Sequence, residues 1–261
     1  MTIGEIMEKK KIMHKLSFLI ILLLAWEATA YSGIYPKALF PSLEAILIKF
    51  YMMLINDNLF GKALYSISMV VASIAISLIL SVLMIVIGNF SEYFKDSTEV
   101  MNSIASPLPG IAILPLVILW FGISRTSMVF IIVHATLWPL WSQLTLSVDR
   151  INSRFSRFIH AFKISKKKSF YHVFFLGTKP DLITGLQISW SRGWRALISI
   201  EMIFGMVGNQ TGLGWLIYER RMYMDTAGLI AGLFAIAICG ILFESLFLKA
   251  KKTEATHGTA D

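Results

Sequence analysis

The feature that most constrains this chain is the stretch 63–88, which is apolar throughout and holds nothing more polar than serine and one tyrosine. About 20 apolar residues suffice for a helix to cross a membrane, so this stretch predicts a transmembrane helix. The chain is 56% apolar and only 15% charged, which is outside the usual composition of soluble domains. We therefore predict an all-α polytopic membrane protein of six spans, the other five being 16–31, 104–122, 128–146, 182–205 and 227–248.

The first apolar stretch, 16–31, admits a second interpretation. It follows a lysine-rich start and ends in Ala28-Thr29-Ala30, which resembles a signal-peptidase site. Trp26 and Glu27 lie just upstream, and a charge at that point is unusual in a cleaved segment. We expect the stretch to remain as a membrane helix.

The basic residues show how the spans are oriented. If the N-terminus is cytoplasmic, the inner segments hold sixteen Lys and Arg and the outer segments six, which places both termini inside. This clustering between spans also argues against a nucleic-acid partner for a net charge of +8. The predicted layout is a cytoplasmic segment 1–15, a transmembrane domain 16–248 that includes the cytoplasmic loop 147–181, and a cytoplasmic tail 249–261.

Residues 41–55 follow the first span on the predicted outer side. They begin with proline and serine, carry Glu44 and Lys49, and are otherwise apolar. This pattern predicts a helix that lies along the membrane surface.

Four stretches together resemble one family: FPSLEAILIKF (40–50), SPLPGIAILPLVILWFGISRTSMVFII (106–132), GLQISWSRGWRALISIEMIFG (185–205) and TGLGWLIYE (211–219). The chain is similar over about 16–248 to permease subunits of ATP-binding-cassette importers for nitrate, aliphatic sulfonates, taurine and bicarbonate. The resemblance implies a type I importer permease fold in the bacterial inner membrane. It further implies a homodimer or a paired permease, a cytoplasmic ATPase dimer and an extracytoplasmic solute-binding protein.

The sequence contains no GxxxxGK[ST] phosphate-binding loop. ATP and magnesium are therefore expected on the partner ATPase. This chain is expected to bind no cofactor or metal and to be a non-catalytic membrane subunit.

The resemblance places the contact with the ATPase in the loop 154–180. Aromatic and aliphatic side chains recur there at helical spacing, which suits a docking helix, although the family's Glu-Ala-Ala start and its glycine are missing. The alternative is a basic loop whose phenylalanines rest in the lipid interface and whose lysines attract anionic headgroups. The predicted coupling residues are Phe158, Ile159, His160, Ala161, Phe162, Lys163 and Ile164.

Charged residues lie inside the predicted span 182–205. An Arg or an acidic residue at the centre of a span costs about 2.5–3.5 kcal/mol, so this helix should be shielded by protein or water. Arg192 and Arg195 share a helix face, and Glu201 is too far along the helix to pair with either of them directly. Two interpretations stay open: a face that lines the solute path and favours an anion, or an internal ion-pair network with Glu27 and Glu244 as candidate partners.

Prolines and glycines in the other spans indicate helix contacts. Pro107, Pro109 and Pro115 need neighbouring helices or water to cover the carbonyls that they leave free. Gly228 and Gly232 form a small-xxx-small pair that permits close helix approach. His134, close to Trp138 in sequence, is expected to be a packing residue, with a proton relay as the alternative.

Two other classes of function fit the sequence less well than a permease does. A secondary transporter would use an ion gradient through the intramembrane charges, but the halves of the chain show no internal repeat. A membrane-embedded enzyme would need a nucleophile with its base or a metal cluster, and neither HExxH nor GxSxG occurs. The sequence therefore favours the importer permease.

Overall fold

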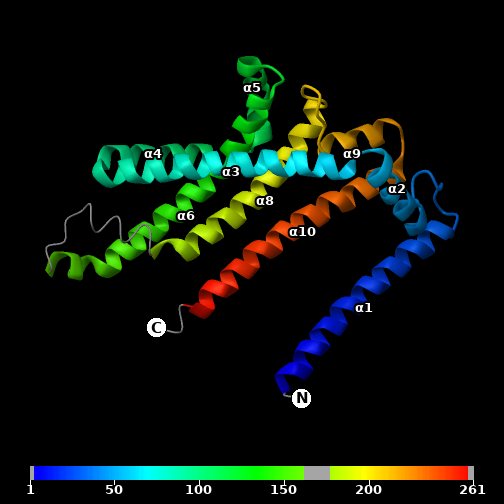
Figure 1. Ribbon diagram of the computed structural model, residues 1–261, viewed down its shortest axis with the longest axis horizontal. Helices are drawn as coiled ribbons and strands as arrows, with labels where there is room; N and C mark the ends of the chain where they lie inside the picture. Colours follow the sequence, from blue (N-terminus) through cyan, green and yellow to red (C-terminus); the bar gives the residue numbers. More distant parts are fainter. Residues whose placement is uncertain (1–2, 162–176, 258–261) are drawn as a thin grey trace. The chain divides into compact units, whose positions relative to one another are not determined.

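A computed structural model describes residues 3–161 and 177–257 of the chain. These residues form helices joined by short connections (Figure 1). Residues Val207 and Gln210 form an isolated β-bridge in one of the connections. The chain divides into two compact units, one made of Met1–Phe60 and Leu216–Ala235, the other of Gly61–Trp215 and Ile236–Asp261.

The first unit begins with α1 (Ile3–Tyr31), which contains the first predicted span. The indole of Trp26 stacks on Phe40 at 4.4 Å and donates a hydrogen bond to the Pro41 carbonyl. The helix α2 (Leu43–Asn56) follows, and the Ser42 hydroxyl accepts the Ala45 amide as its N-cap. The predicted helix at 41–55 is thus confirmed as a helix, and its place at the membrane surface stays a prediction.

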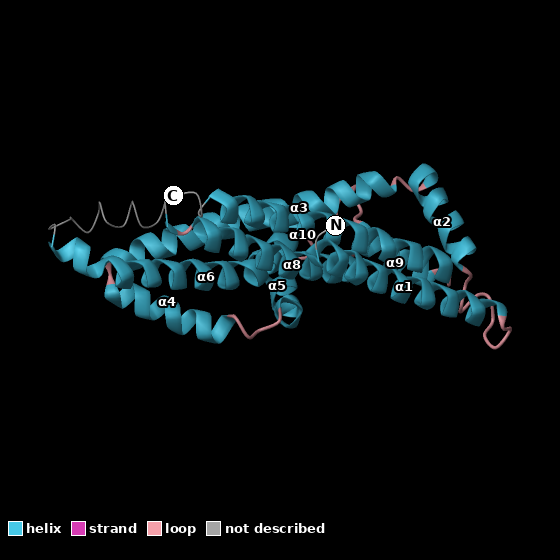
Figure 2. Cartoon of the chain, turned by 90° about the horizontal axis from the view of Figure 1, so that it is seen from below, coloured by secondary structure: helices cyan, strands magenta, loops and turns pink. Residues whose placement is uncertain are grey.

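The second unit is built around the pair α6 (Arg125–Ala161) and α8 (Lys179–Phe204), which run side by side (Figures 1 and 2). Small residues on α8 let the two backbones approach closely. A Cβ on Gly185 would lie 2.8 Å from Leu140, and one on Gly193 would lie 2.8 Å from Thr136. Between them the Ser189 hydroxyl donates to the Thr136 carbonyl.

The long helix α3 (Leu59–Phe90) packs on α6 through buried serines. Ser77 shares a 2.6 Å hydrogen bond with Thr136, and the hydroxyl of Ser81 donates to the Leu137 carbonyl. Both serines are fully buried. Serine serves here because it is small enough for close helix packing and its hydroxyl finds a partner across the contact.

The predicted span 104–122 is wrong as one continuous helix. Helix α4 (Glu92–Ala105) ends before Pro107, and the chain resumes with the 3-10 turn η1 (Gly110–Ile113) and α5 (Leu114–Phe121). The two parts are bent by 89° (Figure 1). Proline removes an amide donor and disfavours a helical residue before it, so closely spaced prolines end α4.

Four described helical segments are long and apolar enough to span a membrane: Met13–Tyr31, Leu59–Phe90, Arg125–Arg154 and Thr226–Lys251. The bent pair α4 and α5 makes five if it counts as one span. The fifth predicted span is present as α8 but carries several charges. The number six therefore stays a prediction, while the helical membrane architecture is confirmed.

Between α8 and α10 (Thr226–His257) lies a helix that we did not predict, α9 (Leu213–Met222). It covers most of the motif TGLGWLIYE. Long exposed apolar side chains cover the described faces of α1 and α10, including Phe18, Leu24 and Ile241. Such surfaces suit contact with lipid or with another chain.

Candidate functional site

Helix α8 has two chemically different faces. One face is buried and includes Trp190, Trp194 and Glu201. The other face is exposed and includes Arg192 and Arg195. Nine residues separate Arg192 from Glu201, which is about half a turn around the helix axis. The arginines and the glutamate therefore take part in different sites.

The Glu201 carboxylate is the centre of a buried hydrogen-bond network. Its side chain is 1% exposed. The Ser66 hydroxyl donates to both carboxylate oxygens, at 2.8 and 3.0 Å, and the Gly214 amide donates to one of them at 2.8 Å. The Ser66 oxygen in turn accepts the Leu213 amide at 3.0 Å. Glu201 thereby joins α8 to α3 and to the start of α9.

This network explains the glycines of the motif TGLGWLIYE. A Cβ on Gly212 would overlap the Glu201 carboxylate, and a Cβ on Gly214 would lie 2.7 Å from the Glu201 Cβ and overlap the Ile198 carbonyl. A side chain at either position would displace the carboxylate or the backbone that binds it. The two motif segments 185–205 and 211–219 are thus halves of one buried contact.

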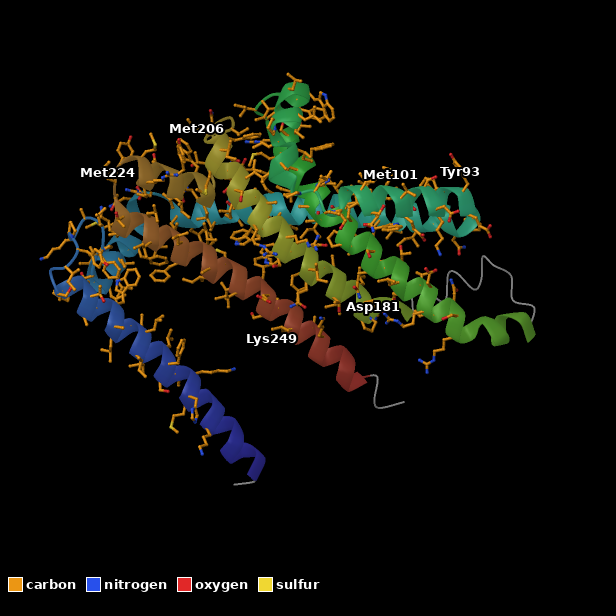
Figure 3. All side chains as sticks on the ribbon, turned by 180° about the vertical axis from the view of Figure 1, so that it is seen from behind. Tyr93, Met101, Asp181, Met206, Met224 and Lys249 are labelled. Atoms are coloured by element: carbon orange, nitrogen blue, oxygen red, sulfur yellow. The ribbon has the colours of Figure 1, made fainter. Side chains whose placement is uncertain are left out.

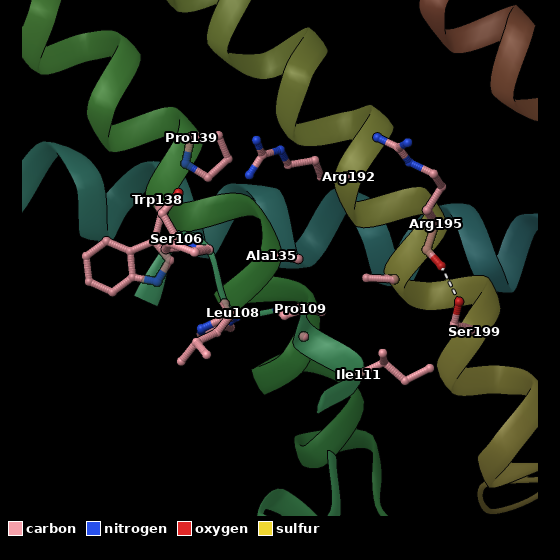
Figure 4. A pocket seen from close by; sticks show the side chains of 14 residues that line it. Ser106, Leu108, Pro109, Ile111, Ala135, Trp138, Pro139, Arg192, Arg195 and Ser199 are labelled. Atoms are coloured by element: carbon pink, nitrogen blue, oxygen red, sulfur yellow. Dashed lines mark hydrogen bonds between the residues drawn. The ribbon is translucent and has the colours of Figure 1, made fainter. Parts of the chain in front are cut away.

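The arginine face of α8 forms one wall of a pocket of about 340 Å³ (Figure 4). The second wall is α6, where Ala135, Trp138 and Pro139 line it, and the third is the broken segment 106–111. The bend between α4 and α5 brings this segment across the two helices. Gly110 makes the approach possible, because a Cβ there would lie 3.0 Å from the Ile131 side chain.

The two arginines are held differently. Arg195 donates from Nε to the Ser191 carbonyl at 3.0 Å, and the Ser199 hydroxyl donates to the Arg195 carbonyl at 2.9 Å. Arg192 extends toward Pro139 across the pocket (Figure 4). Among the described residues of the second unit, neither guanidinium has a carboxylate within ion-pair distance.

The two carboxylates that the sequence suggested as partners of the arginines lie in other settings. Glu27 accepts the Leu43 amide at 2.8 Å, which links α1 to the start of α2. Glu244 is on an exposed face of α10, and no ion pair among residues 3–161 and 177–257 includes it. Glu27 lies in the first unit, whereas the arginines and Glu244 lie in the second, so the ion-pair network stays a prediction.

The predicted helix-packing residues take several positions. Pro107 and Pro109 line the pocket, and Pro115 is in the first turn of α5. A Cβ on Gly232 would lie 3.1 Å from Ile217, so this glycine allows α10 to approach α9 closely. Gly228 donates its amide to Asp225 at 3.1 Å.

The predicted coupling residues fall at the edge of what the structure describes. Phe158, Ile159, His160 and Ala161 belong to the last turn of α6. Phe162, Lys163 and Ile164 lie outside the described residues.

On the other side of the undescribed segment, Asp181 at the start of α8 binds α6 (Figure 3). Its carboxylate accepts the Ser147 hydroxyl at 2.6 Å, the Gln143 amide at 3.2 Å and Arg150 at 3.4 Å. These three residues lie on one face of α6, at spacings of three and four.

A cluster of charges in the first unit was missed by the sequence analysis. Lys49 pairs with Asp225 at 3.0 Å, and Arg220 pairs with both Asp225 and Asp57. Asp225 also caps α10 through the Gly228 amide. Burial opposes ionisation of Asp225, but the Gly228 amide and the Lys49 ammonium outweigh it and lower the pKa of this carboxyl. An aspartate three residues before a helical glycine was a capping signal that could have been read.

Comparisons with known proteins agree with the architecture. Residues 82–248 match the family described as "Binding-protein-dependent transport system inner membrane component". The taurine transport system permease protein TauC of Escherichia coli (strain K12) is 30% identical over 154 residues, 58% of this chain and 54% of TauC. The nitrate import permease protein NrtB of Synechocystis sp. is 24% identical over 160 residues, 61% of this chain and 56% of NrtB.

Another relative aligns over most of both chains. The formylaminopyrimidine transport permease protein ThiX of Halalkalibacterium halodurans is 25% identical over 232 residues, 86% of this chain and 88% of ThiX. The family match covers more than half of the chain and includes the pocket, Glu201 and the motif that binds it. The chain therefore belongs to the family of binding-protein-dependent transport system inner membrane components, which are the permeases of ATP-binding-cassette importers.

Proposed function

We propose that this chain is the translocation subunit of an ATP-driven importer for a small solute such as a sulfonate, taurine, nitrate or a similar compound. It acts as a homodimer or with a paired permease in the bacterial inner membrane, with both termini in the cytoplasm. A separate ATPase dimer binds and hydrolyses ATP with magnesium, and an external binding protein delivers the solute. The family match over residues 82–248 is the observation that carries this proposal.

The length of α6 supports a connection to a cytoplasmic motor. The helix has 37 residues, which is about 55 Å at 1.5 Å per residue. The hydrocarbon core of a membrane is only about 30 Å thick, so the end of the helix that includes Ala161 can stand outside it. The loop 154–180 begins on that end.

The Asp181 contacts connect the loop 154–180 mechanically to the helices α6 and α8. The loop 154–180 leaves α6 and reaches the start of α8, and Asp181 ties this start back to Ser147 and Arg150. A force applied to the loop is therefore shared by both helices of the α6–α8 pair. The same pair forms two walls of the pocket that the arginines line.

Co-purification and transport test the proposal together. The chain is expressed with the proteins of its own operon, purified in detergent and placed in liposomes with the binding protein. We expect an ATPase to co-purify and solute uptake to require ATP and magnesium. Uptake that persists without ATP and follows an imposed ion gradient instead would establish a secondary transporter and refute the proposal.

Two substitutions that each introduce a negative charge test the coupling loop. Ala161→Asp and Phe162→Asp should release the ATPase or abolish ATP-dependent uptake, because a carboxylate is introduced into an apolar docking surface. Thr256→Asp, in the predicted cytoplasmic tail, adds the same charge as a control and should leave both unchanged. The amount of permease in the membrane is measured for each variant. Full ATPase binding and full uptake in both loop variants would exclude this segment as the docking site.

A further inference from the structure

We propose that the pocket between α6, α8 and segment 106–111 binds a small organic oxyanion, with Arg192 as the residue that contacts its charge. This assignment rests on the proposed function as a permease and adds the chemical class of solute and the residue that recognises it. The candidate ligands are short-chain sulfonates and compounds of the same shape and charge.

The charge of the pocket is the first argument. Two arginines line it, and no aspartate or glutamate does. The carboxylate nearest in sequence, Glu201, is turned to the opposite face of α8 and is occupied by Ser66 and Gly214. Two guanidinium groups three residues apart repel each other unless an anion lies near them. The described residues of the second unit supply no such anion.

The second argument is the difference between Arg192 and Arg195. Arg195 is bound to its own helix through Ser191. Arg192 makes neither a hydrogen bond nor an ion pair with another described residue of the second unit, and it extends across the pocket (Figure 4). Its five N–H donors are free to form the paired contacts that guanidinium makes with planar or tetrahedral oxyanions. Arg192 is therefore assigned the charge contact.

Apart from Ser106, His134 and Ser199, the remaining lining is apolar and selects for a ligand with a carbon body. Leu108 and Ile111 on the broken segment face Ala135 and Pro139 on α6 and Ala196 on α8. Small-molecule sites combine such walls with a few polar contacts. An inorganic anion such as nitrate would satisfy Arg192 but leave these walls without contacts, whereas a short alkyl sulfonate would satisfy both.

A binding measurement that does not depend on transport tests the assignment. The chain is placed in phosphatidylcholine nanodiscs, and the thermal unfolding midpoint is titrated with ethanesulfonate. Ethyl methyl sulfone, which has nearly the same shape without the charge, is titrated in parallel. The variants are Arg192→Gln, Arg192→Lys and Arg221→Gln, the last being a matched loss of an exposed arginine outside the pocket.

We expect ethanesulfonate to stabilise the wild-type chain and the sulfone to have no effect. Arg192→Gln should raise the half-saturating concentration about tenfold or more, as the loss of a charge-assisted hydrogen bond predicts. Arg192→Lys should raise it less, and Arg221→Gln should leave it unchanged. Nitrate should stabilise more weakly than ethanesulfonate. Equal responses of wild type and Arg192→Gln would overturn the assignment.

Two other partners for Arg192 give different results, and each of them would overturn the assignment. If a lipid phosphate fills the site, phosphatidylglycerol stabilises the wild type but not Arg192→Gln, and ethanesulfonate has no effect in phosphatidylcholine. If a carboxylate of a second copy fills it, Arg192→Gln weakens the dimer and leaves the response to ethanesulfonate intact. Failure of the permease proposal is seen separately, as uptake without ATP, because the nanodisc measurement needs no ATPase.

Discussion

Substitution of Ser66 by alanine tests the buried network around Glu201. The Ser66 hydroxyl does two things at once, because it donates to the Glu201 carboxylate at 2.8 Å and accepts the Leu213 amide at 3.0 Å. Its side chain is fully buried. Ser66→Ala therefore removes a donor from a buried carboxylate and also leaves a backbone amide without an acceptor.

The expected magnitude follows from these two losses. A typical hydrogen bond is worth about 0.5–1.5 kcal/mol, and an orphaned buried donor costs about 1–3 kcal/mol. In membranes such values shrink, because groups of the unfolded chain also find partners there, and measured interhelical bonds average about 0.6 kcal/mol. We expect Ser66→Ala to lower the free energy of unfolding by about 1–3 kcal/mol, since both losses act together and each is reduced in the membrane.

Ser68 provides the matched control on the same helix. Its hydroxyl donates to the Tyr65 carbonyl within α3 and is exposed, so Ser68→Ala should change the free energy of unfolding by no more than about 0.5 kcal/mol. The assay is unfolding of the purified chain from mixed micelles by increasing sodium dodecyl sulfate, followed by circular dichroism and tryptophan fluorescence. Equal effects of the two substitutions would refute the role assigned to the Glu201 network.

Two further predictions concern Gly214 and Asp225. Gly214→Ala should prevent recovery of folded protein in detergent, because its Cβ would overlap the Ile198 carbonyl. Gly88→Ala is the control and should be tolerated, since its Cβ would make an ordinary 3.5 Å contact with Lys95. Comparable recovery of the two variants as monodisperse protein from size-exclusion chromatography would contradict this prediction. The lowered pKa of Asp225 means that its contribution to stability is complete above pH 3.8 and is lost as the pH falls through the folded-state value. Asp225→Asn should therefore remove part of the acid-induced loss of stability below pH 3.8, as measured by unfolding at a series of pH values. If the variant lost as much stability as the wild type below this pH, Asp225 would not be ionised in the folded cluster.

The partners of the buried hydrogen bonds and the break in the span 104–122 could not be predicted from the sequence. The family resemblance rested in part on the stretches 185–205 and 211–219, but it did not show that Gly214 donates its amide to Glu201. The sequence did not distinguish Ser66 as a partner of Glu201, because α3 contains many serines at similar spacing. Pro107 and Pro109 were expected at a helix contact within one span, and the structure places them at a sharp bend that shapes the pocket.

The amino-acid sequence alone establishes that this is a helical membrane protein and which family it resembles. It could do so because each long apolar stretch must satisfy its own backbone hydrogen bonds in lipid, so helix position and length follow from local composition. The rotation of each helix about its axis, and the partners of its polar residues, depend on how the helices pack together. Arg192 and Glu201 belong to one predicted span, yet they lie on opposite faces of α8, one at an open pocket and the other in a sealed network. Which face is buried depends on close packing against α3 and α6, and those contacts join residues that are far apart in the sequence.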